Sequence, residues 1–279
     1  MSVLFAFTLA LAGFDEAAVS IHVHNPRSVE QINSRTADTL GVETITQLFD
    51  TLALTLKVEQ FPSARSEMMM QRGDNICLPN KVKNAEREQA FLFSLPLNFY
   101  LENRFYSLAD VNLIPAIHLD KQGKVVDIAM LMDTLPDQRI LVPLNISFGE
   151  FIDNELSKVK PQQIISTHQT NYFEHYFGML KARRADFAIF NSSALAEYAK
   201  TADIDLSFLR SYAIAGNQGI IAGHFMCANT PAGQAFIDKI NPVIASFYTN
   251  PEYHKLYYKY LTQDEATEMV NYIKSITAQ

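Results

Sequence analysis

The spacing of hydrophobic positions alternates between strand and helix patterns over the first 78 residues. Residues 18–24 and 54–61 follow a strand pattern, and the intervening residues 39–54 place apolar side chains at helical spacing. A second predicted helix, 63–70, precedes a short buried strand at 75–78. This β-α-β-α-β order predicts a parallel sheet with right-handed crossover connections.

Three local features complete the expectations for this region. The pair Asn25-Pro26 is expected to end the first strand, because a residue before proline disfavours helical geometry. Gly73 is expected to end the second helix. Residues 98–106, rich in aromatic side chains, are predicted to form one long strand, and the polar stretch that follows, to about Gln138, is expected to be turns.

A second α/β series follows this stretch. Its predicted elements are the strands 139–144, 163–167 and 186–190 and the helices 148–159 and 172–182. Near the C-terminus, a strand is predicted at 220–227 and helices at 232–247, 256–260 and 263–276. Two α/β series imply two lobes, and the C-terminal elements are expected to return to the first lobe.

The first residues have the pattern of an export signal. A short apolar run ends in the small-x-small triplet Ala10-Leu11-Ala12, which suits signal peptidase, so residues 1–12 are predicted to be a signal peptide. No Lys or Arg precedes the apolar run, which departs from the usual pattern. A buried first strand or helix is the alternative. No other stretch approaches the length of about 18 apolar residues that a membrane span needs.

Composition and charge exclude several classes of protein. Hydrophobic residues make up 48% of the chain and charged ones 19%, which indicates a folded globular protein. The formal net charge of -7, without any Lys/Arg run, argues against a nucleic-acid partner.

Neither catalysis nor a metal site is expected. The sequence has no G-x-S-x-G, H-E-x-x-H, P-loop or dinucleotide-binding motif, so we expect no enzyme and no cofactor. His22 and His24 are predicted to lie on one face of a strand, but no neighbouring Cys or carboxylate completes a set of metal ligands, and a structural pair is expected.

Two segments resemble a known family. The sequence CLPNKVKNAER at 77–87, followed by FSLPL at 93–97, resembles the t-x-E-R … F-S-x-P-y signature of family 3 bacterial extracellular solute-binding proteins. The segment 178–189, GMLKARRADFAI, is similar to that family's l-x-x-G-R-x-D-a-x-i stretch. Similarity is closer still to an uncharacterised, amino-acid-binding-like subgroup with one Cys before the first motif and another before the C-terminal helix, as Cys77 and Cys227 are placed here.

The resemblance covers about 220 residues and implies a fold and domain boundaries. The implied fold is the type II periplasmic-binding-protein fold, an α/β architecture in which two crossing strands join two lobes around a ligand cleft. Lobe 1 is then expected to comprise 18–103 and 218–279, and lobe 2 to comprise 104–217. The resemblance places both cysteines in lobe 1, where they form either a disulfide or two buried thiols.

The resemblance also implies candidate ligand-binding residues. In the family's amino-acid binders, an Arg matching Arg87, expected here in a loop after a strand, binds the ligand's carboxylate through its guanidinium. Asn145 and Ser147 are expected to cap the helix that follows them and to contact an anionic group together with its free N–H groups. The ring of Tyr100 is a candidate to stack on a ligand, with lobe core as the alternative.

Asn191 departs from the family pattern. It aligns with the Asp that pairs with the ammonium group of an amino-acid ligand, and an amide cannot supply that charge. The loss of a charge-assisted bond, worth about 1.5–3 kcal/mol, argues against an ordinary α-amino acid. The alternatives are a neutral or anionic solute, or another residue that supplies the carboxylate.

These inferences together predict a monomeric periplasmic solute-binding protein that closes on a small polar or anionic solute. Delivery of that solute to an ABC permease is the first expectation. The alternative is a ligand-sensing or degenerate clamp that acts through a protein partner such as a membrane sensor, and the sequence does not separate the two.

Overall fold

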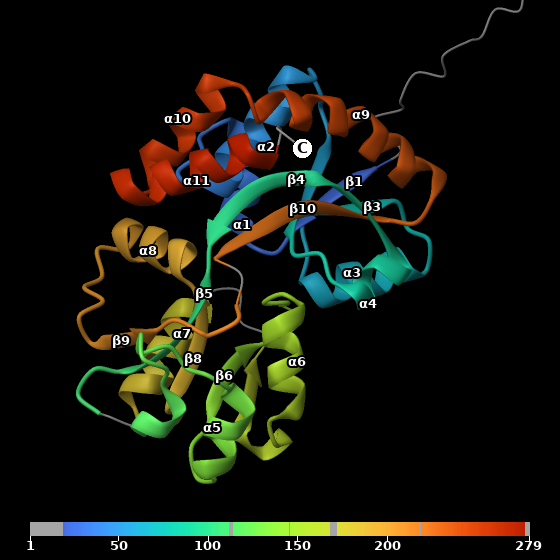
Figure 1. Ribbon diagram of the computed structural model, residues 1–279. Helices are drawn as coiled ribbons and strands as arrows, with labels where there is room; N and C mark the ends of the chain where they lie inside the picture. Colours follow the sequence, from blue (N-terminus) through green and yellow to red (C-terminus); the bar gives the residue numbers. More distant parts are fainter. Residues whose placement is uncertain (1–18, 112–113, 145, 168–171, 218, 277–279) are drawn as a thin grey trace, which may run out of the picture.

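The computed structural model describes residues 19–111, 114–144, 146–167, 172–217 and 219–276. They form two five-stranded sheets, each packed between helices (Figure 1). The predicted signal peptide, 1–12, lies outside the described residues. Within the described part of the chain, no helix combines the length and the apolar character needed to cross a membrane.

The first sheet contains a strand from the C-terminal third of the chain. The strand order is β2-β1-β3-β10-β4, with β1 parallel to β2 and β3, and β10 antiparallel to β3 and β4. The strands are β1 (Ser20–Val23), β2 (Lys57–Gln60), β3 (Ile76–Lys81), β4 (Phe91–Leu101) and β10 (Ile220–Ala228). This arrangement joins the N-terminal and C-terminal parts of the chain in one lobe.

Helices cover the first sheet on both faces because its strands alternate between two cores. Cys77, Phe225 and Cys227 point into the larger core, whereas Leu78 and Met226 point into the smaller one. The helices of this lobe are α1 (Pro26–Ser34), α2 (Leu40–Thr51), α3 (Ser63–Gln71), α4 (Ala85–Ala90), α9 (Pro231–Phe247), α10 (Pro251–Tyr260) and α11 (Gln263–Ile276). The larger core takes side chains from α1, α2 and α9 to α11, and the smaller core from α3.

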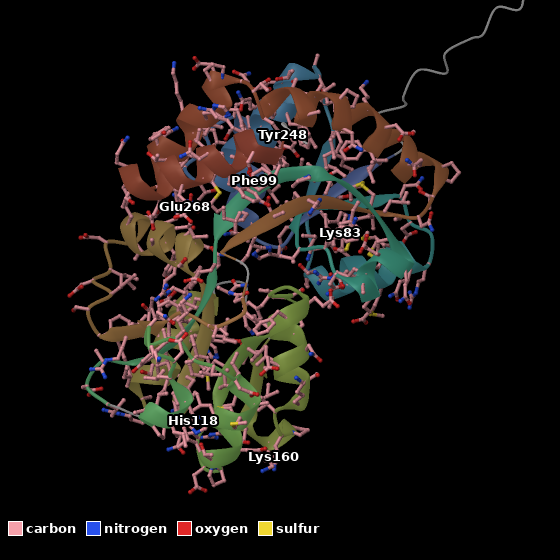
Figure 2. The ribbon with its side chains drawn as sticks, viewed as in Figure 1. Lys83, Phe99, His118, Lys160, Tyr248 and Glu268 are labelled. Atoms are coloured by element: carbon pink, nitrogen blue, oxygen red, sulfur yellow. A yellow bond between two sulfur atoms is a disulfide. The ribbon has the colours of Figure 1, made fainter. Side chains whose placement is uncertain are left out.

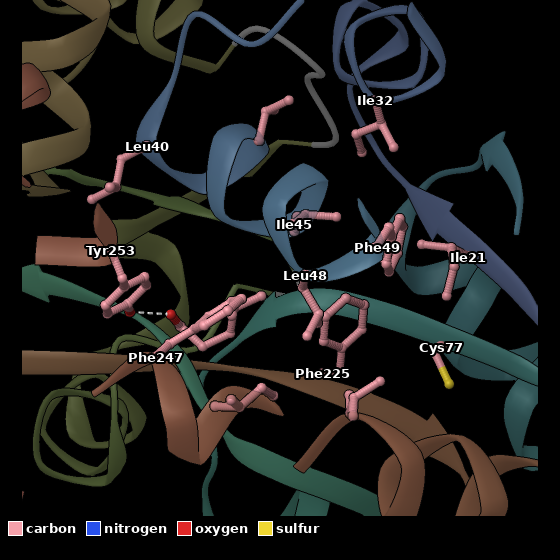
Figure 3. Close-up of a cluster of buried hydrophobic side chains, with 14 of the residues drawn as sticks. Ile21, Ile32, Leu40, Ile45, Leu48, Phe49, Cys77, Phe225, Phe247 and Tyr253 are labelled. Atoms are coloured by element: carbon pink, nitrogen blue, oxygen red, sulfur yellow. Dashed lines mark hydrogen bonds between the residues drawn. The ribbon is translucent and has the colours of Figure 1, made fainter. Parts of the chain in front are cut away.

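Aromatic side chains tie the C-terminal helices to the sheet. Phe99 on β4 packs edge-on against Tyr248, with ring centroids 5.9 Å apart (Figure 2). Tyr253 donates a hydrogen bond to the Leu97 carbonyl, and its oxygen accepts one from the Tyr257 hydroxyl. Figure 3 shows the neighbouring part of this core, in which Leu48, Phe49 and Phe225 meet. These contacts fix β4 before the chain leaves the lobe.

The second sheet has the strand order β7-β6-β8-β5-β9. Its strands are β5 (Asn103–Leu108), β6 (Ile140–Pro143), β7 (Ile164–Thr167), β8 (Phe187–Asn191) and β9 (Leu209–Tyr212). Its helices are α5 (Ile128–Thr134), α6 (Glu150–Lys158), α7 (Tyr172–Lys181) and α8 (Ser192–Thr201), with short 3-10 turns η2 (Ala116–His118) and η3 (Pro161–Gln163). The core under α5 and α6 is separate from the core under α7 and α8.

The chain passes between the two sheets twice, between Leu101 and Asn103 and again between Tyr212 and Ile220. The single strand predicted at 98–106 is therefore wrong, because β4 and β5 belong to different sheets and part at Glu102. The boundaries 18–103, 104–217 and 218–279 remain a prediction, and Asn103 pairs within the second sheet.

Several helices differ from the expectations. Asn25-Pro26 ends β1 and also starts α1, because the Asn25 side chain accepts from the Arg27 N–H and proline occupies the first helical turn. Arg87 was expected in a loop, but it lies in the short helix α4. The sequence analysis also missed α5 and α8.

Cys77 and Cys227 form a disulfide across the first sheet. The two residues face each other on the antiparallel strands β3 and β10, with Cα atoms 4.1 Å apart. Both side chains are fully buried, and Cys77 borders the cluster of apolar side chains in Figure 3. The disulfide thus joins segments 150 residues apart in the sequence.

Candidate functional site

A cavity of about 610 Å³ lies between the two sheets and takes its lining from both. On the first-lobe side, the carboxyl ends of β1 and β3 contribute, together with residues of α1 to α4; on the other side, the contribution comes from the carboxyl ends of β6 and β7. Ligands of open α/β sheets bind at this edge, where loops and helix N-termini present unpaired backbone groups. The cavity is therefore the candidate ligand-binding site.

Arg87 lines this cavity from α4. Its Nη1 donates to the Val82 carbonyl at 3.2 Å, and its Nη2 pairs with a carboxylate oxygen of Glu67 at 3.3 Å. The side chain is only 11% exposed. The Arg87 N–H donates to Oδ1 of Asn84, the N-cap of α4, which fixes the start of the helix. A guanidinium held in this way is suited to binding an oxyanion.

Lys81, at the end of β3, brings a second cation to the same wall. Its Nζ lies 3.5 Å from the Glu67 carboxylate, so Lys81 and Arg87 share one counter-charge. Burial lowers the pKa of Lys81 to about 8, against the attraction of Glu67, and the charge of Arg87 lowers it further. At neutral pH, two cations and one carboxylate therefore form this cluster.

His22 and His24 both line the cavity, but their surroundings differ. His22 is buried, stacks on Phe61 at 4.3 Å and shares a hydrogen bond with Ser66, and burial lowers its pKa. His24 is exposed and lines the cavity just after β1; desolvation at this place, followed by the charge of Lys81, lowers its pKa to about 4. Both rings are therefore uncharged at pH 7. Among the described residues, no group of three His, Cys, Asp or Glu gathers to hold a metal.

Ser147 lines the cavity from the second lobe, and its hydroxyl contacts the first lobe. It donates to Asp153 at 2.5 Å and accepts from Nδ2 of Asn84 at 3.2 Å. Ser147 was expected to cap α6, and this is wrong: Gly149 is the N-cap, and no side chain caps the helix. Ser147 lies two residues earlier, where its Oγ accepts a hydrogen bond from the Gly149 N–H. Asn145, the other residue expected there, lies outside the described residues.

Asn191 and Tyr100 are not among the described residues that line the cavity. Asn191 is the N-cap of α8; its Oδ1 accepts from Ala194 N–H at 3.0 Å and its Nδ2 donates to the Leu101 carbonyl at 2.7 Å. The Tyr100 ring packs between Gly41 of α2 and Gly223 of β10, and burial raises the pKa of its hydroxyl. Arg87 and Ser147 thus come together at the cavity, and the other two do not join them.

The sequence analysis did not identify Lys81, Glu67 or Asn84 as site residues. Lys81 and Asn84 stand inside the segment 77–87 that carries the first family motif, so their place beside Arg87 could have been inferred from a predicted strand end. Glu67 lies 20 residues before Arg87, and nothing in the sequence indicates that the two meet.

Comparison with known sequences gives no relative: no protein-family model and no curated protein matches the chain. Comparison with solved structures finds proteins that share the fold of this chain over most of its length. The chain is similar to an ancestral arginine-binding protein bound to arginine, with a TM-score of 0.62 and 12% identity, covering 89% of this chain and 100% of the other.

Two further structures have the same fold. A histidine kinase sensor domain with similarity to periplasmic binding proteins has a TM-score of 0.63 and 12% identity, covering 88% of this chain and 96% of the other. An arginine third transport system periplasmic binding protein from Legionella pneumophila has a TM-score of 0.60 and 16% identity, covering 88% and 99%. The two-lobed periplasmic-binding-protein fold expected from the sequence is confirmed.

Proposed function

We propose that this protein is a family 3 solute-binding protein whose two lobes close on a small anionic or polar solute and deliver it to an ABC transporter. The observation that carries the proposal is the cavity between the lobes, where Arg87 and Lys81 face the space that a ligand would fill. Similar proteins of known structure are binding proteins, which supports binding without catalysis.

The proposal includes export to the periplasm as a monomer, with residues 1–12 as the signal peptide. A disulfide supports this location, because disulfides persist in oxidising compartments and are rare in the cytosol. Similarity to periplasmic binding proteins supports it as well. Size-exclusion chromatography of the mature chain tests the monomer, and N-terminal sequencing of the exported protein tests the cleavage site.

A thermal-shift screen over organic acids, amino acids, sugars and aromatic metabolites tests the binding function. A ligand present at 100 times its dissociation constant is expected to stabilise the folded state by about 2.7 kcal/mol. Arg87→Ala is expected to remove most of the shift for the ligand found, and Arg72→Ala is the matched control. Arg72 is exposed and precedes β3 at the end of the strand opposite the cavity.

If the whole screen leaves the melting temperature unchanged, or if Arg87→Ala retains the full shift, the anion-binding function is excluded. Calorimetric titration of the responding ligand then measures stoichiometry, which is expected to be one ligand per chain because both lobes line one cavity.

Ligand sensing through a protein partner is the second candidate function. It is favoured by the similarity to a histidine kinase sensor domain, which covers 88% of this chain. Copurification of the tagged protein from membranes distinguishes the two: a permease is expected with transport, and a membrane sensor with signalling.

A further inference from the structure

Among the described residues, the charged side chains that line the cavity are all cationic, and this restricts the ligand more than the proposed function does. They are Arg65, Lys81 and Arg87, and no Asp or Glu of the described chain is part of the lining. Glu67 faces Lys81 and Arg87, but its carboxylate is already engaged by both. With one carboxylate between Lys81 and Arg87, an ammonium group in the cavity would therefore approach an excess of positive charge.

The rest of the lining is mainly aliphatic and comes from both lobes. Val42 and Ile45 of α2 and Ile32 of α1 contribute on one side, and Leu144 and Ile146 on the other. Leu144 and Ile146 are each 41% exposed, and Met68, on α3, is 53% exposed. Apolar side chains that are left exposed at a cleft are covered when an apolar group enters and the lobes close.

The cationic groups are few, whereas apolar groups line the cavity from several elements. Lys81 and Arg87 stand at the end of β3 and on α4, and apolar side chains of the first lobe come from α1 and α2, from Met68 of α3 and from Leu78 of β3. A ligand that satisfies both has a charged end and an apolar body. Its charged end meets two donors that are already fixed by Glu67 and by the Val82 carbonyl.

We propose that the cleft selects a monocarboxylate with an apolar body and no ammonium group, and that Lys81 binds the carboxylate together with Arg87. This inference rests on the proposed function and specifies its ligand class. Glu67 acts as a positioning residue that holds both cations and weakens their attraction for an anion.

Matched ligands test the class. Hexanoate, norleucine and hexanamide share a chain and differ in charge, and 3-phenylpropionate and phenylalanine form a second pair with and without the ammonium group. Succinate adds a hydrophilic dicarboxylate. Titration calorimetry at pH 7 keeps the Lys81 ammonium charged, since its pKa is about 8. At least one apolar acid is expected to bind about tenfold to a hundredfold more tightly than its amino or amide counterpart.

Substitutions test the residues. Lys81→Met keeps the aliphatic stem and is expected to weaken binding of the apolar acid about tenfold. Lys83→Met is the control, because Lys83 is only two residues from Lys81 but pairs with Glu88 and is not among the residues that line the cavity. Glu67→Gln is expected to tighten binding several-fold, because it frees both cations, whereas a merely structural role predicts lower stability and no gain in affinity.

The outcomes separate the inference from the proposed function. Equal or tighter binding of norleucine or phenylalanine overturns the inference and leaves a solute-binding protein. If succinate binds and neither hexanoate nor 3-phenylpropionate binds, the inference is also overturned and a solute-binding protein remains. If none of these compounds binds but the broad screen finds another solute, the inference is wrong and the function stands; if the screen also finds nothing, both are wrong.

Discussion

At the residue scale, the disulfide is a covalent link between two segments of the first lobe that lie 150 residues apart in the sequence. Cys77 and Cys227 lie at the centre of the sheet, so the bond fixes β10 against β3. A closed loop of 150 residues restricts the unfolded chain strongly. Its main effect is therefore expected on the free energy of unfolding rather than on the shape of the cavity.

We predict that the reduced wild-type protein is less stable than the oxidised protein by about 2–5 kcal/mol. Both sulfurs stay in place in this comparison, so packing changes little. Urea unfolding of the two forms measures the difference, with the reduced form prepared under denaturing conditions because both cysteines are fully buried. Equal midpoints would contradict a stabilising role.

Individual side-chain roles were the least predictable part of the site. Asn191 is the last residue of β8, a position that suits both a ligand contact and a helix cap, and only the bond from the Ala194 N–H identifies it as the cap. Tyr100 carries an aromatic ring that suits a cavity or a core equally well. The sequence could place Arg87 near the ligand, but the pairing with Glu67 depends on how α3 and α4 pack.

At the element scale, the buried strands were predictable and several helices were not. Most of the buried strands, such as β3, β6, β8 and β10, are short apolar runs that are visible without any structure, whereas β9, with the sequence LRSY, was not predicted. Asn25-Pro26 fits the end of a strand and the start of a helix, and here it serves both, so α1 was missed. The helix α8 begins with Ser192-Ser193, a pair that is also typical of loops. In the structure, the Ser192 hydroxyl donates to the Glu102 carbonyl and the Ser193 hydroxyl accepts from the Leu101 N–H.

One contact between elements is expected to depend on pH. Glu197 of α8 in the second lobe accepts a hydrogen bond from the Leu40 N–H at the start of α2 in the first lobe, at 2.7 Å. Burial raises the pKa of Glu197 to about 7, the bond from Leu40 opposes this, and the charge of Asp38 adds to it. The folded protein therefore holds a proton that the unfolded chain releases near pH 4.5.

The sign follows from linkage. The stabilising contribution of this proton is complete below pH 4.5 and is lost as the pH rises to about 7, by on the order of 3 kcal/mol. We predict that Glu197→Gln flattens the stability profile between pH 5 and 8. Chemical unfolding across this range measures the effect, with Glu268→Gln on the exposed side of α11 as the control (Figure 2). Parallel profiles for wild type and Glu197→Gln would exclude Glu197 as the source.

At the scale of the whole molecule, two polar contacts join the lobes on different sides of the crossing strands. Asn84 bonds to Ser147 between α4 and the loop before α6, and Leu40 bonds to Glu197 between α2 and α8. Figure 1 shows α6 and α8 on opposite sides of β5. The two-lobe plan was predictable from two successive α/β series, but contacts between lobes depend on their relative orientation, which no local pattern encodes.

The contact of Asn84 gives a direct test of lobe closure. Asn84→Asp keeps the oxygen that accepts from the Arg87 N–H, so α4 retains its cap. It replaces the donor to Ser147 with a negative oxygen close to Asp153, whose carboxylate lies 3.5 Å from Asn84 Nδ2. Like charges at this distance repel by about 1 kcal/mol in a water-like environment. The closed arrangement of the lobes should therefore become less populated.

We predict that Asn84→Asp weakens ligand binding about fivefold to tenfold and increases the radius of gyration of the ligand-free protein in solution scattering. The control is Asn250→Asp, which makes the same change at the N-cap of α10, a residue that is not part of the cavity lining. A lower melting temperature with unchanged affinity and unchanged scattering would mean that Asn84 only caps α4. Weaker binding together with a larger radius of gyration would mean that the affinity depends on the equilibrium between open and closed lobes as well as on the ligand contacts.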